Sequence, residues 1–92
     1  MATRILIPTP LRHYTDKRDS IEVDAATVGE ALEDLMNHYT VLRKQLYADD
    51  GTLRSYVNIY VNDEDIRYAQ KEKTPVTPND VISIVPSIAG GA

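Results

Sequence analysis

The chain has 92 residues, of which 42% are hydrophobic and 26% charged, a composition that allows one folded domain and excludes a second, catalytic one. Its formal net charge of −4 opposes non-specific binding to nucleic-acid phosphates. The lack of cysteine excludes disulfides, thiolate metal sites and a cysteine nucleophile.

Two alternating segments open the chain and predict neighbouring strands. In TRILIPT, residues 3–9, Ile5 and Ile7 fall on one side and Leu6 on the other. SIEVDA, residues 20–25, alternates in the same way, and the short polar link between the two segments favours a hairpin.

A capping box predicts where the main helix begins. Thr27 is followed three residues later by Glu30, and apolar residues then recur at helical spacing. These positions are Val28, Ala31, Leu32, Leu35, Met36 and Tyr39. The segment VLRKQLYADDG, residues 41–51, predicts a short second helical turn that ends before Gly51.

The segment YVNIYVN, residues 56–62, predicts a sheet strand. Val57 and every second residue after it share one face, whereas Tyr60 and its alternates share the other. The stretch over residues 62–80 is polar and rich in turn residues, so we expect at most a short strand near residues 66–68.

The last strand is predicted for DVISIVP, residues 80–86, where Ile82 and Ile84 face one way, Val85 faces the other and Pro86 ends the strand. The order of elements fits an α+β fold, a mixed sheet with one main helix packed on one face. We expect the first and last strands to lie parallel at its centre, because the helix supplies the long connection that parallel strands require.

The chain then continues as SIAGGA, residues 87–92. We expect a domain over residues 1–86 and a flexible tail over residues 87–92, because the tail has little apolar mass and two glycines. A narrow glycine tail can enter a confined active site. The alternative is a frayed end without function.

Three segments resemble the ThiS/MoaD family of ubiquitin-like sulfur carriers. VPSIAGGA at residues 85–92 is similar to the family's Gly-Gly tail. VNIYVNDEDIRY at residues 57–68 and IPTPLRHYT at residues 7–15 resemble the CysO branch, which carries sulfide for cysteine synthesis. The resemblance implies the β-grasp fold and a carrier that catalyses nothing and binds no cofactor of its own.

The resemblance also implies the partners. An adenylyltransferase of the ubiquitin-activating type (MoeB or ThiF) would use ATP to adenylate the carboxylate of Gly91, and sulfur would displace AMP to leave a thiocarboxylate. Ile88, Ala89 and Gly90 would form the rest of the inserted tail. A pyridoxal-phosphate-dependent cysteine synthase would supply the acceptor, an aminoacrylate.

Ala92 departs from the family pattern, because active carriers end at the second glycine, here Gly91. Related carriers with extra terminal residues are trimmed by metalloproteases of the JAMM type, so Ala92 is expected to mark a precursor. The other interpretation is that Ala92 is a cloning residue.

Leu6, Tyr60 and Val85 are out of phase with the inward residues of their strands, so we expect them to share the sheet face opposite the helix. Such an apolar surface, with Pro86 beside it, is expected to dock the activating enzyme. Tyr56 and Tyr60, on one strand face, are either covered by the domain's own segments or anchors at an interface.

The remaining polar residues give weaker signals. Asp63, Glu64 and Asp65 form either a solvated turn or a docking site for a basic patch on the activating enzyme. His13 and His38 are too few and too separated for a metal site.

Two other functions remain open: a non-covalent interaction module of ubiquitin-like fold, and a protein modifier attached to lysines through Gly91. The apolar run before Pro8 is too short for a signal peptide, and no run reaches the length of a membrane span. We therefore expect a cytoplasmic protein without nucleic-acid or membrane partners.

Overall fold

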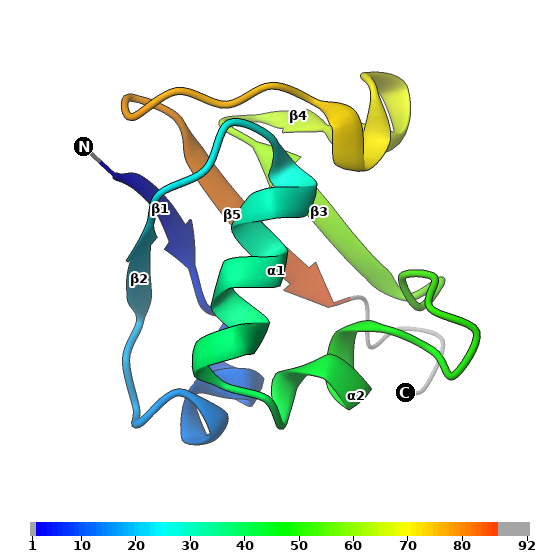
Figure 1. Cartoon of the computed structure of the whole chain (residues 1–92). Coiled ribbons are helices and arrows are strands. Elements are labelled where there is room, and N and C mark those ends of the chain that lie inside the picture. Colours follow the sequence, from blue (N-terminus) through cyan, green and yellow to red (C-terminus); the bar gives the residue numbers. More distant parts are fainter. Residues whose placement is uncertain (1, 87–92) are drawn as a thin grey trace.

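The computed structural model describes residues 2–86, while residue 1 and residues 87–92 lie outside this range. Five strands form one sheet in the order β2-β1-β5-β3-β4, and the helices pack on one of its faces (Figure 1). The strands are β1 Thr3–Leu6, β2 Ser20–Val23, β3 Val57–Val61, β4 Glu64–Asp65 and β5 Val81–Pro86.

The strand pairing confirms the predicted mixed sheet. β1 pairs antiparallel with β2 and parallel with β5, and β5 pairs antiparallel with β3. The last strand therefore lies at the centre, next to the first. Helix α1, Val28–His38, lies across one face of the sheet, and its C-terminal end lies near β2 (Figure 1).

Polar contacts at its N-terminus begin α1 where the capping box predicts. Thr27 Oγ1 accepts from the backbone N–H of Glu30 at 3.2 Å, and Glu30 Oε1 accepts from the N–H of Ala26 at 3.0 Å. These bonds satisfy donors that have no partner inside the helix. Tyr39, predicted as the last apolar helical position, lies just past the helix as its C-cap.

The core forms between the inner sheet face and the helices. Helix α2, Leu42–Leu46, is too short to be stable alone, so its stability comes from Leu42 and Leu46, both 0% exposed. The buried apolar residues are Ile5, Ile7, Leu11, Val23, Val28, Ala31, Leu32, Leu35, Met36, Leu42, Leu46, Val57, Ile59, Ile66, Val76, Ile82 and Ile84.

The strand predicted near residues 66–68 is wrong in position. Ile66–Tyr68 forms a 3-10 helix, and the short strand is β4, which ends one residue earlier. Asn62 adopts a left-handed conformation with φ of 57°, so the chain reverses at once and pairing with β3 resumes at Glu64. Asp65 then caps the 3-10 helix by accepting from the N–H of Arg67 at 2.9 Å.

Two other 3-10 helices, Thr9–Tyr14 and Lys71–Lys73, lie in segments where the sequence pattern predicts no helix. The first belongs to the link between β1 and β2, which nevertheless pair as the predicted hairpin.

We expect Thr27→Ala to lower the free energy of unfolding by about 1 kcal/mol, because it removes the side-chain oxygen that caps α1. Urea denaturation measures this loss. Thr40→Ala is the matched control, since Thr40 is exposed and is not the N-cap of α2. Equal stability of the two variants would contradict the contribution of the cap.

Candidate functional site

The central strand carries the chain out of the sheet. Pro86, the last described residue, pairs with Val57 of β3 at the end of β5. The end of β5 therefore belongs to a central strand of the sheet, which lies between β1 and β3 (Figure 1). The predicted tail and processing residues Ile88, Ala89, Gly90, Gly91 and Ala92 lie outside the described residues.

The sheet face away from α1 carries an apolar patch. The strand registers align Leu6, Ser83 and Tyr60 in one row across β1, β5 and β3. Val85 lies one outward position further along β5. Leu6 is 39% and Val85 43% exposed, and Tyr60 is half-buried. The predicted common face is confirmed, and we call Leu6, Tyr60, Ser83 and Val85 the sheet patch.

Two neighbouring residues differ in their relation to the sheet patch. Pro86, predicted beside it, alternates to the helix side of β5 and pairs with buried Val57, so it borders the patch only at the strand end. Tyr56 is 46% exposed, which excludes the interpretation that the domain's own segments cover it.

The acidic turn divides into exposed and buried carboxylates. Asp63 and Glu64 are exposed, as a solvated turn predicts, but Asp65 is only 8% exposed. Strand pairing sets Asp65 directly opposite Tyr60, so its carboxylate lies at the edge of the sheet patch. The prediction of a solvated turn is therefore wrong for Asp65.

Arg67 forms an ion pair with the carboxylate of Asp65. Its Nη2 lies 2.9 Å from Asp65 Oδ2, and it also donates to the side-chain oxygen of Asn58 on β3. Hydrogen bonds from the Arg67 side chain, and then from its backbone N–H, hold the pKa of the Asp65 carboxyl below its usual value. Asp65 and Arg67 thus link β4 and the following 3-10 helix to β3 beside Tyr60.

Residues 2–86 contain no group of three or more histidine, aspartate or glutamate side chains arranged to hold a metal ion. His13 stacks on Tyr14 with ring centroids 3.9 Å apart, whereas His38 bonds the carbonyl oxygen of Asp34 on its own helix. Among the described residues no helix is long and apolar enough to cross a bilayer.

Sequence reasoning missed Arg67 and Asn58 as neighbours of this surface. The spacing of Asp65 and Arg67 signals a capped turn, which the segment shows. The hydrogen bond from Arg67 to Asn58 could not be predicted from the sequence, because it forms only when β4 folds back onto β3.

Comparison with known proteins places these features in context. The family model described as the ThiS family matches residues 5–91. Sulfur carrier protein CysO of Mycobacterium tuberculosis is 36% identical over 99% of this chain and 100% of that protein. Small archaeal modifier protein 3 of Haloferax volcanii is 32% identical over 74% of this chain and 73% of that protein.

One solved structure bears directly on the fold. A chain of the Amycolatopsis orientalis BexX/CysO complex superimposes with a TM-score of 0.88 and 34% identity, covering 98% of this chain and 100% of that chain. The five-stranded mixed sheet with one main helix is thus the predicted β-grasp fold.

Asp65→Asn tests the link beside Tyr60. Because the folded-state pKa of Asp65 is lowered, its ionised form stabilises the fold above pH of about 4, and this contribution disappears as the pH falls through the folded-state pKa. We expect the variant to be less stable than the natural chain at neutral pH and to lose less stability below pH of about 4.

Urea denaturation across that pH range measures the effect. Asp63→Asn is the matched control, because it removes a carboxylate of the same turn that forms no ion pair within residues 2–86. A parallel pH dependence of Asp65→Asn and the natural chain would show that the ion pair does not stabilise the fold.

Proposed function

The chain belongs to the ThiS family of sulfur carriers, and from this we propose that it carries sulfur as a thiocarboxylate on Gly91 for cysteine synthesis. The observation that carries this proposal is the extent of the family match, which runs over residues 5–91 and so includes Gly91. The similarity to CysO over 99% of the chain supports the cysteine branch, whose motifs the sequence resembles.

The chemistry needs a free carboxylate and no side-chain nucleophile. An oxygen of the Gly91 carboxylate attacks the α-phosphorus of ATP, and pyrophosphate leaves. Sulfide then attacks the acyl carbon, and the C–O bond to AMP breaks to leave the thiocarboxylate. ThiS-family carriers are non-enzymatic, so the activating and acceptor enzymes supply the catalytic groups.

A residue follows Gly91, so the carboxylate becomes available only when the bond between Gly91 and Ala92 is cut. We assign this cut to a metalloprotease of the JAMM type. The acceptor is a pyridoxal-phosphate-dependent cysteine synthase, which takes the sulfur on its aminoacrylate.

The sheet patch is the docking surface in this proposal. It is an exposed apolar surface next to the end of β5, and such patches mark protein interfaces. An extended chain over residues 87–91 spans at most about 17 Å, enough for Gly91 to enter a channel while the patch stays docked. A CysO relative forms a complex with BexX, which supports a partner complex for this chain.

Asp63 is the exposed acidic residue that we propose to face a basic patch on the activating enzyme. Asp65 has a different part in this proposal. The carboxylate of Asp65 is paired with Arg67, so we propose that Asp65 holds the surface beside Tyr60 in shape and does not contact the partner itself.

A second candidate function is a protein modifier joined through Gly91 to lysines, which the similarity to small archaeal modifier protein 3 favours. Both functions share the adenylation step. Mass spectrometry of cell extracts separates them: a free carrier with sulfur in place of one terminal oxygen supports sulfur transfer, whereas Gly-Gly remnants on other proteins support modification.

We expect the chain ending at Gly91 to be adenylated at least about 100-fold faster than the full chain, because Ala92 displaces the reacting carboxylate by one residue, roughly 3.5 Å. ATP–pyrophosphate exchange with the activating enzyme, without protease, measures both forms. Equal rates would exclude the precursor interpretation.

A chain that ends at residue 91 and carries Gly91→Ala separates chain length from shape. Its carboxylate is in the correct position, but its methyl group must fit a channel shaped for bare glycine backbone. We expect about a tenfold loss of exchange rate. A rate equal to that of the chain ending in Gly91 would show that the activating enzyme depends on the position of the carboxylate and not on the shape of the last residue.

Tyr60→Glu is expected to weaken binding to the activating enzyme by about 2 kcal/mol, the size of an interface hot spot. The physical reason is that it puts a charge in the middle of the sheet patch. Tyr68→Glu is the matched control, because Tyr68 is 84% exposed and lies on the 3-10 helix after β4. If both variants bind as the natural chain does while folding normally, the sheet patch is not the docking surface.

A further inference from the structure

The outer edge of β2 has no strand beside it in the part of the chain that the structure describes. The N–H of Ile7 donates to the carbonyl of Asp19 at 2.9 Å, and the same register makes Ile21 a hydrogen-bonded residue of β2. In an antiparallel pair, the residues between such positions direct their backbone groups away from the partner strand. The N–H and C=O groups of Ser20 and Glu22 therefore point to the free edge.

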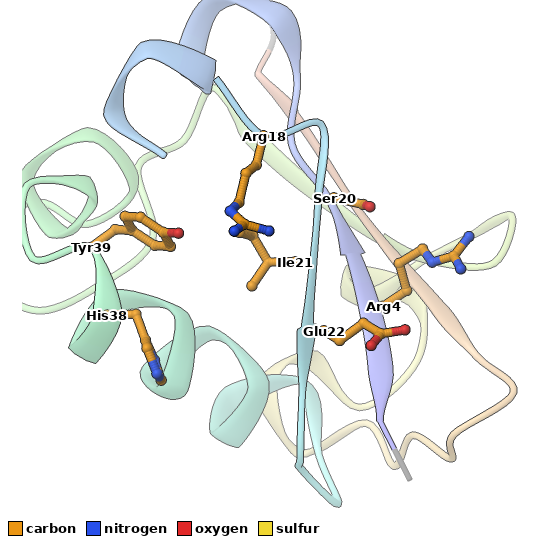
Figure 2. A pocket seen from close by; sticks show the side chains of 7 residues that line it. All are labelled: Arg4, Arg18, Ser20, Ile21, Glu22, His38 and Tyr39. Atoms are coloured by element: carbon orange, nitrogen blue, oxygen red, sulfur yellow. The ribbon is translucent and has the colours of Figure 1, made fainter. Parts of the chain in front are cut away.

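A groove of about 440 Å³ lies between this edge and the C-terminal end of α1. Figure 2 shows the side chains of Ile21 and Tyr39 on its two sides, with Arg18 reaching into the space between them. Ile21 and Tyr39 are half-buried and pack against the core, so they form an apolar wall already held in place. We call this space the β2–α1 groove.

The charge inside the β2–α1 groove is positive. Arg18 forms no ion pair within residues 2–86. Glu22 and Arg4 also border the groove, but in Figure 2 their side chains point to the other side of β2. His38 is engaged with the backbone of its own helix. A ligand in the groove therefore meets one unpaired guanidinium beside an apolar wall.

We propose that the β2–α1 groove binds an extended segment of a partner protein that combines apolar residues with an acidic residue. The segment adds to the sheet as a sixth strand on β2, using the backbone groups of Ser20 and Glu22. One of its apolar side chains packs against the wall formed by Ile21 and Tyr39, and its carboxylate pairs with Arg18, whose side chain reaches into the same space.

The same features argue against a second copy of the chain as the occupant. Each copy carries a net charge of −4, which opposes their approach. A separate acidic and apolar segment can instead fill the groove and pair with the edge together.

The β2–α1 groove is separate from the sheet patch, which lies on the opposite face of the sheet. Ile21 shares the helix side with its partner Ile5, whereas Leu6 is exposed on the other side. The inference therefore does not rest on the proposed function. A change at Arg18 is expected to leave adenylation of Gly91 unchanged.

The test uses the full chain and a synthetic probe, a blocked peptide of valine, isoleucine and threonine residues followed by glutamates. We expect titration to shift the amide NMR signals of residues 20–23 and of Tyr39 to saturation. Arg18→Glu should weaken the affinity about fivefold, at the upper end of the effect of an exposed ion pair. Replacing the glutamates of the probe by lysines should have a similar effect.

Two controls make the result specific. Lys73→Glu changes the net charge by the same amount on the exposed 3-10 helix Lys71–Lys73, away from the groove, and should bind as the natural chain does. The same probe with alternate backbone amides N-methylated should not bind, because it cannot pair with the edge of β2.

Three outcomes would overturn the proposal. The first is no shift at millimolar probe, and the second is a set of shifts centred on Leu6 and Val85, which would place the probe on the sheet patch. The third is a doubled molecular mass in light scattering, together with amide signals of residues 20–23 that shift with protein concentration when no probe is present. That outcome would assign the groove to a second copy.

Discussion

Parallel pairing of β1 with β5 is the constraint from which the other features of this structure follow. Parallel neighbours cannot be joined by a tight turn, so the chain between them must leave the sheet and cross one of its faces. Here that connection contains α1 and α2, and their apolar residues close the core on one side only. Within residues 2–86 no helix covers the other face, and the last strand ends in the middle of the sheet.

In the proposed function, the reactive carboxylate belongs to Gly91 and the folded body provides recognition through the sheet patch. A terminal carboxylate can be presented to several enzymes, because none of them needs a pocket in the carrier. The position of β5 between β1 and β3 ties that surface to the start of the terminal segment.

Polar contacts also hold the ends of strands β3, β4 and β5 together. Asn62 donates its backbone N–H to the carbonyl of Val81 at 2.7 Å and accepts from the N–H of Val81 through its side chain at 3.1 Å. The ion pair of Asp65 and Arg67 does the same for β4. The Asp65–Arg67 pair lies at the edge of the sheet opposite β2, whose outer edge has no such cover among the described residues.

Local patterns in the sequence were enough to predict four of the five strands, the main helix and their order, because alternation and helical spacing are local properties of the chain. Thr27 and Glu30 marked the start of α1 because a capping box acts within a single turn. The common face of Leu6, Tyr60 and Val85 also followed from alternation, once the strands were placed in one sheet.

Features that depend on residues far apart in the chain, or on backbone geometry, became visible only in the folded structure. The burial of Asp65 required the left-handed turn at Asn62, the pairing with Tyr60 and the contact with Arg67, and an acidic run in the sequence gives no sign of these. The β2–α1 groove likewise exists because β2 lies at the sheet edge while the end of α1 packs near it. Which strand occupies the edge is settled by long-range pairing, whereas local spacing records only that a strand forms.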